Sequence, residues 1–114
     1  MVEKATSVDH IFEMMPRAFL PDKAGDAKAV TQYVISGDGG GNWTVVVADG
    51  KCTAEKGEHD SPDVTISASD KNFLDFMNGD LNPNSALMTG KVKIKGKIAL
   101  AMKMDKWFAE EWPD

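Results

Sequence analysis

The residue types that most often carry out catalysis are few and widely spaced in this sequence. Its two histidines are His10, on the polar side of a predicted helix, and His59, in a predicted loop. A nucleophile and its base must lie within hydrogen-bond reach of each other, and a pair that included either histidine would need long-range geometry that the spacing does not predict. We interpret both as solvated surface residues. A stand-alone hydrolase stays an alternative only if a pocket-facing Ser, Cys or Asp lies within reach of one of them.

Three further motifs suggest metal, phosphate or thiol chemistry, and each has a simpler interpretation. Glu58, His59 and Asp60 are potential metal ligands, but adjacent residues rarely point at one ion, and a structural zinc site needs more Cys and His. The glycines of residues 37–41 lack the Gly-Lys-Ser/Thr ending of a phosphate loop and precede a predicted strand, which favours a hairpin connection. Cys52 lies in a predicted strand and is interpreted as a small core residue. We expect no catalytic residue, no metal and no cofactor.

The charged residues exclude one class of partner. The chain has 13 basic and 18 acidic residues, a formal net charge of −5, and a field of that sign repels nucleic acid. Lysine alternates with apolar residues over residues 91–97, which is typical of a solvated sheet face or a charged strand edge. A weak contact between this lysine stripe and an anionic lipid surface remains an alternative.

The first part of the chain predicts one amphipathic helix. Its apolar residues recur at helical spacing and are Val8, Ile11, Phe12, Met15 and Phe19. Thr6 or Ser7 can cap its start, because a hydroxyl oxygen there accepts a hydrogen bond from a free backbone N–H. Since Pro16 removes a backbone hydrogen bond and clashes with the preceding turn, we expect the helix to be kinked or broken near Pro16 and to end before Pro21.

The middle of the chain changes to the two-residue period of β-strands. The predicted strands are residues 29–36, 42–48, 51–56 and 64–68. Asp49-Gly50 is a strong signal for a two-residue hairpin, because both positions can accept a positive φ. We expect the four strands to form an antiparallel meander.

The last part of the chain is mostly helical. Ser69 is placed to cap a helix over residues 70–78, and Asn82-Pro83 starts a second helix that ends at Gly90. Residues 91–95 alternate as a half-buried strand, and residues 98–108 place apolar side chains along one stripe of a final helix. Because each amphipathic element must bury its apolar side, one sheet with helices against one face satisfies this order. The predicted fold class is α+β.

Adaptable apolar side chains are what this sequence has in excess. It contains seven methionines, and methionine is unbranched and polarizable, so it lines irregular or variable cavities well. Periodicity alone does not decide whether the apolar residues of the second half are core or the lining of a ligand cavity.

Several segments resemble the sterol carrier protein 2 family. In the second half they are Pro62-Asp63-Val64-Thr65-Ile66, Asn72-Phe73-Leu74, residues 77–86, residues 90–96 and residues 100–104. Upstream, residues 42–45 and Asp49-Gly50-Lys51 resemble the family's second strand and hairpin. The segments follow one another in the correct order over nearly the whole chain. The most specific combination is Gly-Asp-Leu-Asn-Pro followed by Gly-Lys-Val-Lys-Ile-Lys-Gly.

The resemblance implies a five-stranded, mostly antiparallel sheet with helices packed on one face and an apolar tunnel between sheet and helices. Family members hold fatty acids, fatty acyl-CoA, sterols or phospholipids in this tunnel, and the domain itself catalyses no reaction. Carried onto this sequence, the resemblance implies a tunnel lined by Phe76, Met77, Leu81, Leu87, Met88, Ile98, Met102 and Met104, with Trp107 and Phe108 in its wall or lid.

The resulting expectation is a non-enzymatic lipid binder or carrier of low specificity. With 114 residues the chain is near the usual size of one domain, so we expect residues 1–114 to form a single domain. A single cysteine and a start without a secretory segment favour the cytoplasm. The alternative is a module that senses or presents a small apolar effector and works with a partner enzyme of lipid metabolism.

Overall fold

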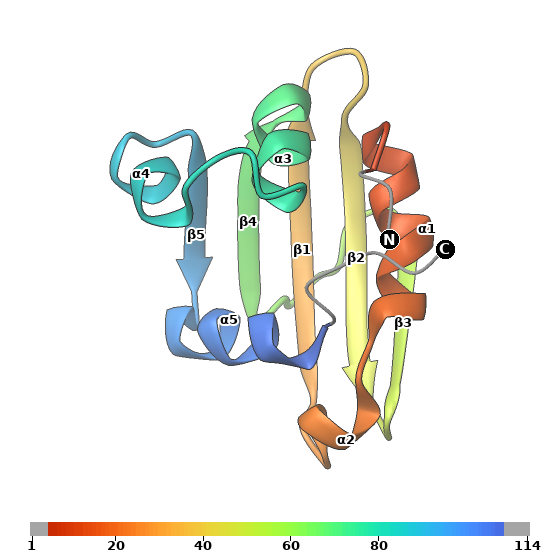
Figure 1. Cartoon of the computed structure of the whole chain (residues 1–114). Helices are drawn as coiled ribbons and strands as arrows, with labels where there is room; N and C mark the ends of the chain where they lie inside the picture. Colours follow the sequence, from red (N-terminus) through yellow and green to blue (C-terminus); the bar gives the residue numbers. More distant parts are fainter. Residues whose placement is uncertain (1–4, 109–114) are drawn as a thin grey trace.

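The computed structural model describes residues 5–108. Its elements, in chain order, are α1 (Val8–Ala18), α2 (Pro21–Ala24), β1 (Ala29–Ser36), β2 (Gly41–Ala48), β3 (Lys51–Lys56), β4 (Val64–Ser69), α3 (Asp70–Met77), α4 (Pro83–Met88), β5 (Val92–Gly96), α5 (Ile98–Met104) and a 3-10 turn η1 (Asp105–Trp107). Figure 1 shows the five strands as one sheet with the helices in front of it. The predicted α+β class is confirmed, and α2 is an addition to the predicted order.

The amphipathic pattern at the beginning of the chain forms α1. The Ser7 hydroxyl oxygen accepts a hydrogen bond from the His10 N–H (3.1 Å), so Ser7 is the cap. The helix runs through Pro16 to Ala18 and is therefore not broken there. It ends before Pro21, as predicted, and Pro21 begins α2 because its fixed φ suits the first helical position.

The sheet has the strand order β3-β2-β1-β4-β5. β1 pairs antiparallel with β2, β2 with β3, and β4 with β5, whereas β4 pairs parallel with β1. The predicted meander is therefore correct for β1 to β3 and wrong for β4, which does not continue from β3 but lies on the other side of β1. The result is a mixed sheet with β1 at its centre.

A buried glutamine explains why the chain crosses the sheet after β3 and does not pair a fourth strand with β3. Gln32 points away from the helices, because successive side chains of a strand alternate and its neighbour Tyr33 faces α1. The Gln32 side chain is nevertheless buried, with 4% exposure. Its amide group donates to the carbonyl oxygens of Trp43 (3.1 Å) and Gly57 (3.2 Å), and its oxygen accepts the His59 N–H (2.6 Å). A buried amide without partners is costly. These bonds therefore hold the loop after β3 against the outer face and direct the chain past β1.

Two glycine-containing turns connect the first three strands. Asp49 (φ 54°) and Gly50 (φ 73°) both have positive φ, so the predicted two-residue hairpin between β2 and β3 is confirmed. Between β1 and β2, the Gly39 N–H donates to a carboxylate oxygen of Asp70 (2.9 Å), and a Cβ at Gly37 would collide with that carboxylate. The glycines of residues 37–41 therefore form a hairpin connection, as predicted, and pack against the start of α3.

Two core clusters lie on the helical side of the sheet. In the first, the ring of Phe12 stacks on Trp43 (4.6 Å between centroids) and Phe73 (5.6 Å), and meets Tyr33 edge-on (5.1 Å). The second cluster consists of Phe19, Ala24, Ala29, Val47, Met104 and Trp107. No helix among residues 5–108 covers the opposite face (Figure 1), and none of the described helices has the length and apolar content that crossing a membrane requires.

Candidate functional site

β4 and β5 present apolar side chains to the helical side of the sheet. The register pairs Ile66 with Ile94 and places Ile66 beside Tyr33, a core residue, so the three side chains share one face. Ile66 and Ile94 are only half-buried, whereas Val45 and Val47, on the same face of β2, are 0% exposed. Val64 and Val92, at the starts of these two strands, are buried on the same face, so the middle of the β4–β5 half is the part that is incompletely covered.

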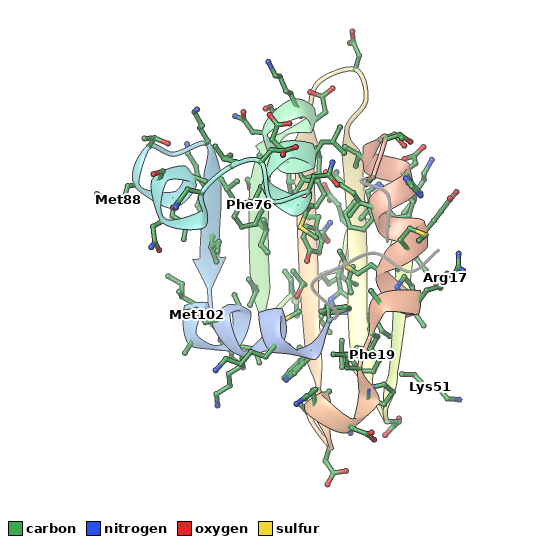
Figure 2. All side chains as sticks on the ribbon, in the orientation of Figure 1. Arg17, Phe19, Lys51, Phe76, Met88 and Met102 are labelled. Atoms are coloured by element: carbon green, nitrogen blue, oxygen red, sulfur yellow. The ribbon has the colours of Figure 1, made fainter. Side chains whose placement is uncertain are left out.

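α3 contributes both to the core and to this incompletely covered region. The Ser69 hydroxyl oxygen accepts the Asn72 N–H (3.2 Å) and caps the helix, as predicted. Phe73 is buried in the aromatic cluster, while Phe76 and Met77 are half-buried. Figure 2 shows Phe76 on the side of α3 that faces α4. Phe73 thus fixes the helix and leaves the two residues near its end with apolar surface to spare.

Asn78 fixes the end of α3 against the beginning of the described chain. Its amide group donates to the Ala5 carbonyl oxygen (2.9 Å) and its oxygen accepts the Ala5 N–H (2.8 Å), although the two residues are 73 positions apart. Ala5 is itself buried in the first core cluster. Sequence analysis assigned Asn78 only to a helix end, because an amide at such a position carries no signal of a distant partner.

α4 is short and largely exposed. The side chain of Asn82 accepts a backbone N–H in the first turn (3.1 Å), which agrees with the predicted Asn-Pro helix start. Ala86 is buried where α4 contacts β5, and Leu81, just before the helix, is half-buried. Leu87 and Met88 are 44% and 87% exposed. Ala86 therefore holds the helix, and its last two apolar side chains face outward.

α5 is exposed at its start and buried at its end. Ile98 and Met102 are 52% and 70% exposed. Met104 is buried, and its sulfur accepts a hydrogen bond from the buried Thr31 hydroxyl in β1 (3.3 Å). This contact anchors the end of α5 to the central strand, so the helix extends from the core outward to the β5 edge (Figure 1).

The residues after α5 close on the link between α1 and α2. The Leu20 N–H donates to the Trp107 carbonyl oxygen (2.6 Å), and Phe19 forms a β-bridge with Phe108. The rings of Phe19 and Phe108 lie 5.6 Å apart. Trp107 is buried and Phe108 half-buried, so this segment forms a wall at the lower end of the helical layer.

The predicted lining residues fall into three groups. The half-buried ones are Phe76, Met77, Leu81 and Phe108. The exposed ones are Leu87, Met88, Ile98 and Met102, and the buried ones are Met104 and Trp107. Contact of any of them with a ligand stays a prediction.

Asp63 joins β1, β4 and α5 at the lower end of this region. Its carboxylate accepts the Val30 N–H (2.9 Å) and the Lys97 ammonium (3.3 Å). The Lys97 backbone N–H donates to the Asp63 carbonyl oxygen (2.9 Å). The Val30 N–H first, and then Lys97, hold the pKa of Asp63 below its usual value. Asp63 therefore ties the start of α5 to the sheet.

The reactive side chains are held in structural roles. The Nδ1 atoms of His10 and His59 accept the backbone N–H groups of Thr6 (3.1 Å) and Ser61 (3.0 Å). Cys52 packs against the core, and burial raises the pKa of its thiol to about 11, so the thiolate is scarce at neutral pH. Within residues 5–108, no group of three or more His, Cys, Asp or Glu could hold a metal ion.

An open hollow of about 300 Å³ lies on the other face of the sheet. Val34, Ser67 and Lys93 line it, together with Asn72 at the start of α3, and none of the predicted tunnel residues takes part. Its mixed lining suits water or a small polar group better than a hydrocarbon tail. The apolar region under α3, α4 and α5 remains the candidate site.

Solved structures with the same architecture identify the class of fold. The palmitated SCP2L2 protein of Aedes aegypti superposes with a TM-score of 0.70 at 24% identity, and the match covers 96% of this chain and 100% of that one. The stereoselective inverting sec-alkylsulfatase Pisa1 of Pseudomonas sp. matches with a TM-score of 0.74 at 20% identity, over 93% of this chain but 16% of that one. The fold is that of a sterol carrier protein 2 domain.

Sequence comparison leads from the fold to the family. The chain is 34% identical over 104 residues to hydroxysteroid dehydrogenase-like protein 2 of Bos taurus, covering 90% of this chain and 25% of that protein. It spans a quarter or less of the length of the curated relatives it matches. Residues 9–109 match the SCP-2 sterol transfer family. The chain belongs to this family, which confirms the resemblance found in the sequence.

Proposed function

We propose that this chain binds a single lipid, without catalysing a reaction, in the apolar region between β4 and β5 and the helices α3, α4 and α5. One observation carries the proposal: Ile66, Ile94, Phe76 and Met77 come from three different elements and are half-buried on the covered side of the sheet. Covering apolar side chains in this state with a hydrocarbon chain removes their surface from water, which lowers the free energy. Membership of a sterol transfer family supports the same conclusion.

The ligands that suit this region are long apolar molecules, namely fatty acids, fatty acyl-CoA, sterol-like molecules or phospholipids. Removing hydrocarbon from water contributes about 0.8 kcal/mol per methylene, so a sixteen-carbon chain gains on the order of 10 kcal/mol before the costs of immobilisation. Micromolar affinity needs no specific polar contact. Because methionine adapts to many shapes, we expect weak discrimination among apolar tails.

A pair of matched substitutions tests the location of the site. Ile66→Trp places an indole on the helical face of β4, and Val34→Trp places one on the outer face of neighbouring β1, in the polar hollow. Delipidated protein is titrated with a fluorescent fatty acid. We expect saturable binding that Ile66→Trp weakens at least ten-fold and Val34→Trp leaves within two-fold. Absence of saturable binding by the folded wild-type protein contradicts the proposal.

A second candidate function follows from the lengths of the similar proteins. The matching part is 25% of the bovine dehydrogenase-like protein and 16% of the Pseudomonas sulfatase, so the same fold occurs within larger proteins that carry enzyme names. This favours a module that presents an apolar molecule to a partner enzyme of lipid metabolism. Capture of one dominant partner enzyme, with poor lipid transfer between vesicles, distinguishes this function from that of a carrier.

We further propose that residues 1–114 form one domain that acts in the cytoplasm, where a single cysteine stays reduced. A carrier must take its lipid from a bilayer, so a weak contact with a membrane surface belongs to the proposed function.

A further inference from the structure

Large apolar side chains are exposed mainly at one edge of the molecule. Five are exposed among residues 5–108, and four of these, Leu87, Met88, Ile98 and Met102, belong to α4 and α5. The two helices flank β5, which within the described residues pairs only with β4. Figure 2 shows Met88 and Met102 at this edge, opposite the edge that carries Lys51. Single exposed apolar residues are ordinary, but a group confined to one edge marks an interaction surface.

The same edge carries an unbroken excess of positive charge. Residues 87–104 contain five lysines and no acidic residue, in a chain with 13 basic and 18 acidic residues. Lys93 and Lys95 alternate with half-buried or buried residues of β5 and are exposed on its outer face. Lys97 is paired with Asp63. We define the β5-edge surface as Leu87, Met88, Ile98, Met102, Lys91, Lys93, Lys95 and Lys103.

We propose that the β5-edge surface docks on an anionic phospholipid bilayer. Exposed methionines and lysines along one edge suit an interfacial site, because the apolar side chains enter the acyl boundary while the long lysine stems keep their charges among the head groups. Charge complementarity selects an anionic bilayer over a neutral one. It also argues against a second copy of this chain, because a two-fold contact through this surface would bring like charges together.

The amphipathic helix at the start of the chain does not offer the same contact. The apolar residues of α1 are Val8, Ile11, Phe12, Met14, Met15 and Ala18, and all of them are buried. Using them on a membrane would require opening the core, whereas the β5-edge surface is exposed already. The docking itself depends on this surface alone, but its use for loading lipid beside β5 depends on the proposed function.

Flotation with vesicles tests the docking. The full chain is mixed with vesicles of phosphatidylcholine alone, or of phosphatidylcholine with one quarter phosphatidylglycerol, at low and high salt. Lys93→Glu/Lys95→Glu changes the β5-edge surface, and Lys23→Glu/Lys51→Glu makes the same change of charge on α2 and β3. Met88→Asp/Met102→Asp removes the exposed apolar groups, and circular dichroism verifies the fold of each variant.

We expect binding to the anionic vesicles only, and its loss at high salt. Since each lysine near an anionic surface contributes about five-fold to binding, the β5 charge variant should bind at least about 20-fold more weakly. The methionine variant should also weaken binding, and the α2–β3 control should change it less than three-fold. An equal loss in the control, or equal binding to both kinds of vesicle, overturns the proposal.

Two further outcomes separate this proposal from its alternatives. Retention on immobilised polyglutamate with no binding to anionic vesicles at the same ionic strength overturns bilayer docking in favour of an acidic protein partner. A dimer in solution that Met102→Asp dissociates overturns it in favour of a second copy. Fatty-acid binding by the same preparation is measured separately. A wild-type chain that binds the fatty acid but not the anionic vesicles rejects the docking and leaves the proposed function standing.

Discussion

The helical side of the sheet is packed in two different ways. Over β1 and β2, α1 and α3 bring four aromatic rings together, and the strand residues beneath them are buried. Over β4 and β5, the apolar residues Ile66 and Ile94 stay half-buried beneath shorter helices, although Val64 and Val92 at the starts of these strands are buried. Both halves belong to one sheet, so the difference arises from the length and placement of the covering helices. Aromatic rings fill the first half, whereas the second half keeps half-buried apolar side chains.

The largest effect is expected in the aromatic cluster. Phe12→Ala should lower the free energy of unfolding by about 3–5 kcal/mol, because Phe12 contacts the rings of three other residues and its removal leaves a cavity. Urea unfolding followed by circular dichroism measures the loss. Phe76→Ala makes the same chemical change in the half-buried region, and an equal loss there would contradict the distinction between the two halves.

Asn78 ties the end of α3 to Ala5 of the first core cluster, so its removal should be the next most damaging. Asn78→Ala deletes two hydrogen bonds to Ala5, of 2.9 Å and 2.8 Å, and leaves backbone groups of a buried residue without partners. A loss of roughly 1–3 kcal/mol in unfolding free energy is expected. Hydrogen exchange should quicken first at the end of α3. Asn84→Ala, at an exposed position of α4, is the control and should leave both measurements unchanged.

Phe76→Ala also tests whether the two halves differ in fatty-acid binding. Truncation of this half-buried ring should weaken fatty-acid binding about ten-fold, which corresponds to about 1.4 kcal/mol, while the folded state persists. A fluorescence titration supplies the affinity and a thermal melt the stability. If binding is unchanged, Phe76 does not line the site, and the proposed location under α3 and α4 is wrong.

The smallest effect concerns pH and the residue that ties α5 to the sheet. The pKa of Asp63 is lowered in the folded protein, so its carboxylate contributes stability above its unfolded pKa of about 4 and loses this contribution as pH falls through the lower, folded value. Asp63→Asn should therefore be slightly less stable than the wild type at pH 7, and the difference should shrink in acid. Asp26→Asn, at an exposed loop position, serves as the control. A difference that grows in acid would contradict the assigned sign.

Local signals in the sequence predicted most elements of this fold. Ser7 and Ser69 cap helices where hydroxyl residues precede apolar periodicity, and Asp49-Gly50 forms the hairpin that its backbone freedom predicts. The position of β4 was not predictable in this way, because the bonds of Gln32 to residues 43, 57 and 59 act over distances along the chain that strand patterns do not contain.

The candidate site was predicted less completely than the fold. The resemblance supplied residues from α3, α4 and α5, but it did not point to the strand residues Ile66 and Ile94, which face the same side of the sheet. The resemblance also placed both Met102 and Met104 in the lining, although residues two positions apart point to opposite sides of a helix, and one is exposed while the other is buried. That division depends on the anchor between Met104 and Thr31, a contact between distant parts of the chain.

The strand order also determines when each half can form during synthesis. Among the described elements, α1 and the β1–β3 hairpins leave the ribosome before the others, and the residues of the aromatic cluster are all available once Phe73 has emerged. Among the strands of residues 5–108, β5 is made last, and only β5 pairs with the edge of β4 that faces away from β1. A nascent chain that stops before β5 therefore has the residues of the aromatic cluster but leaves one edge of β4 unpaired, and an unpaired strand edge can pair with another chain. The β4–β5 half of the sheet is therefore completed after the aromatic cluster.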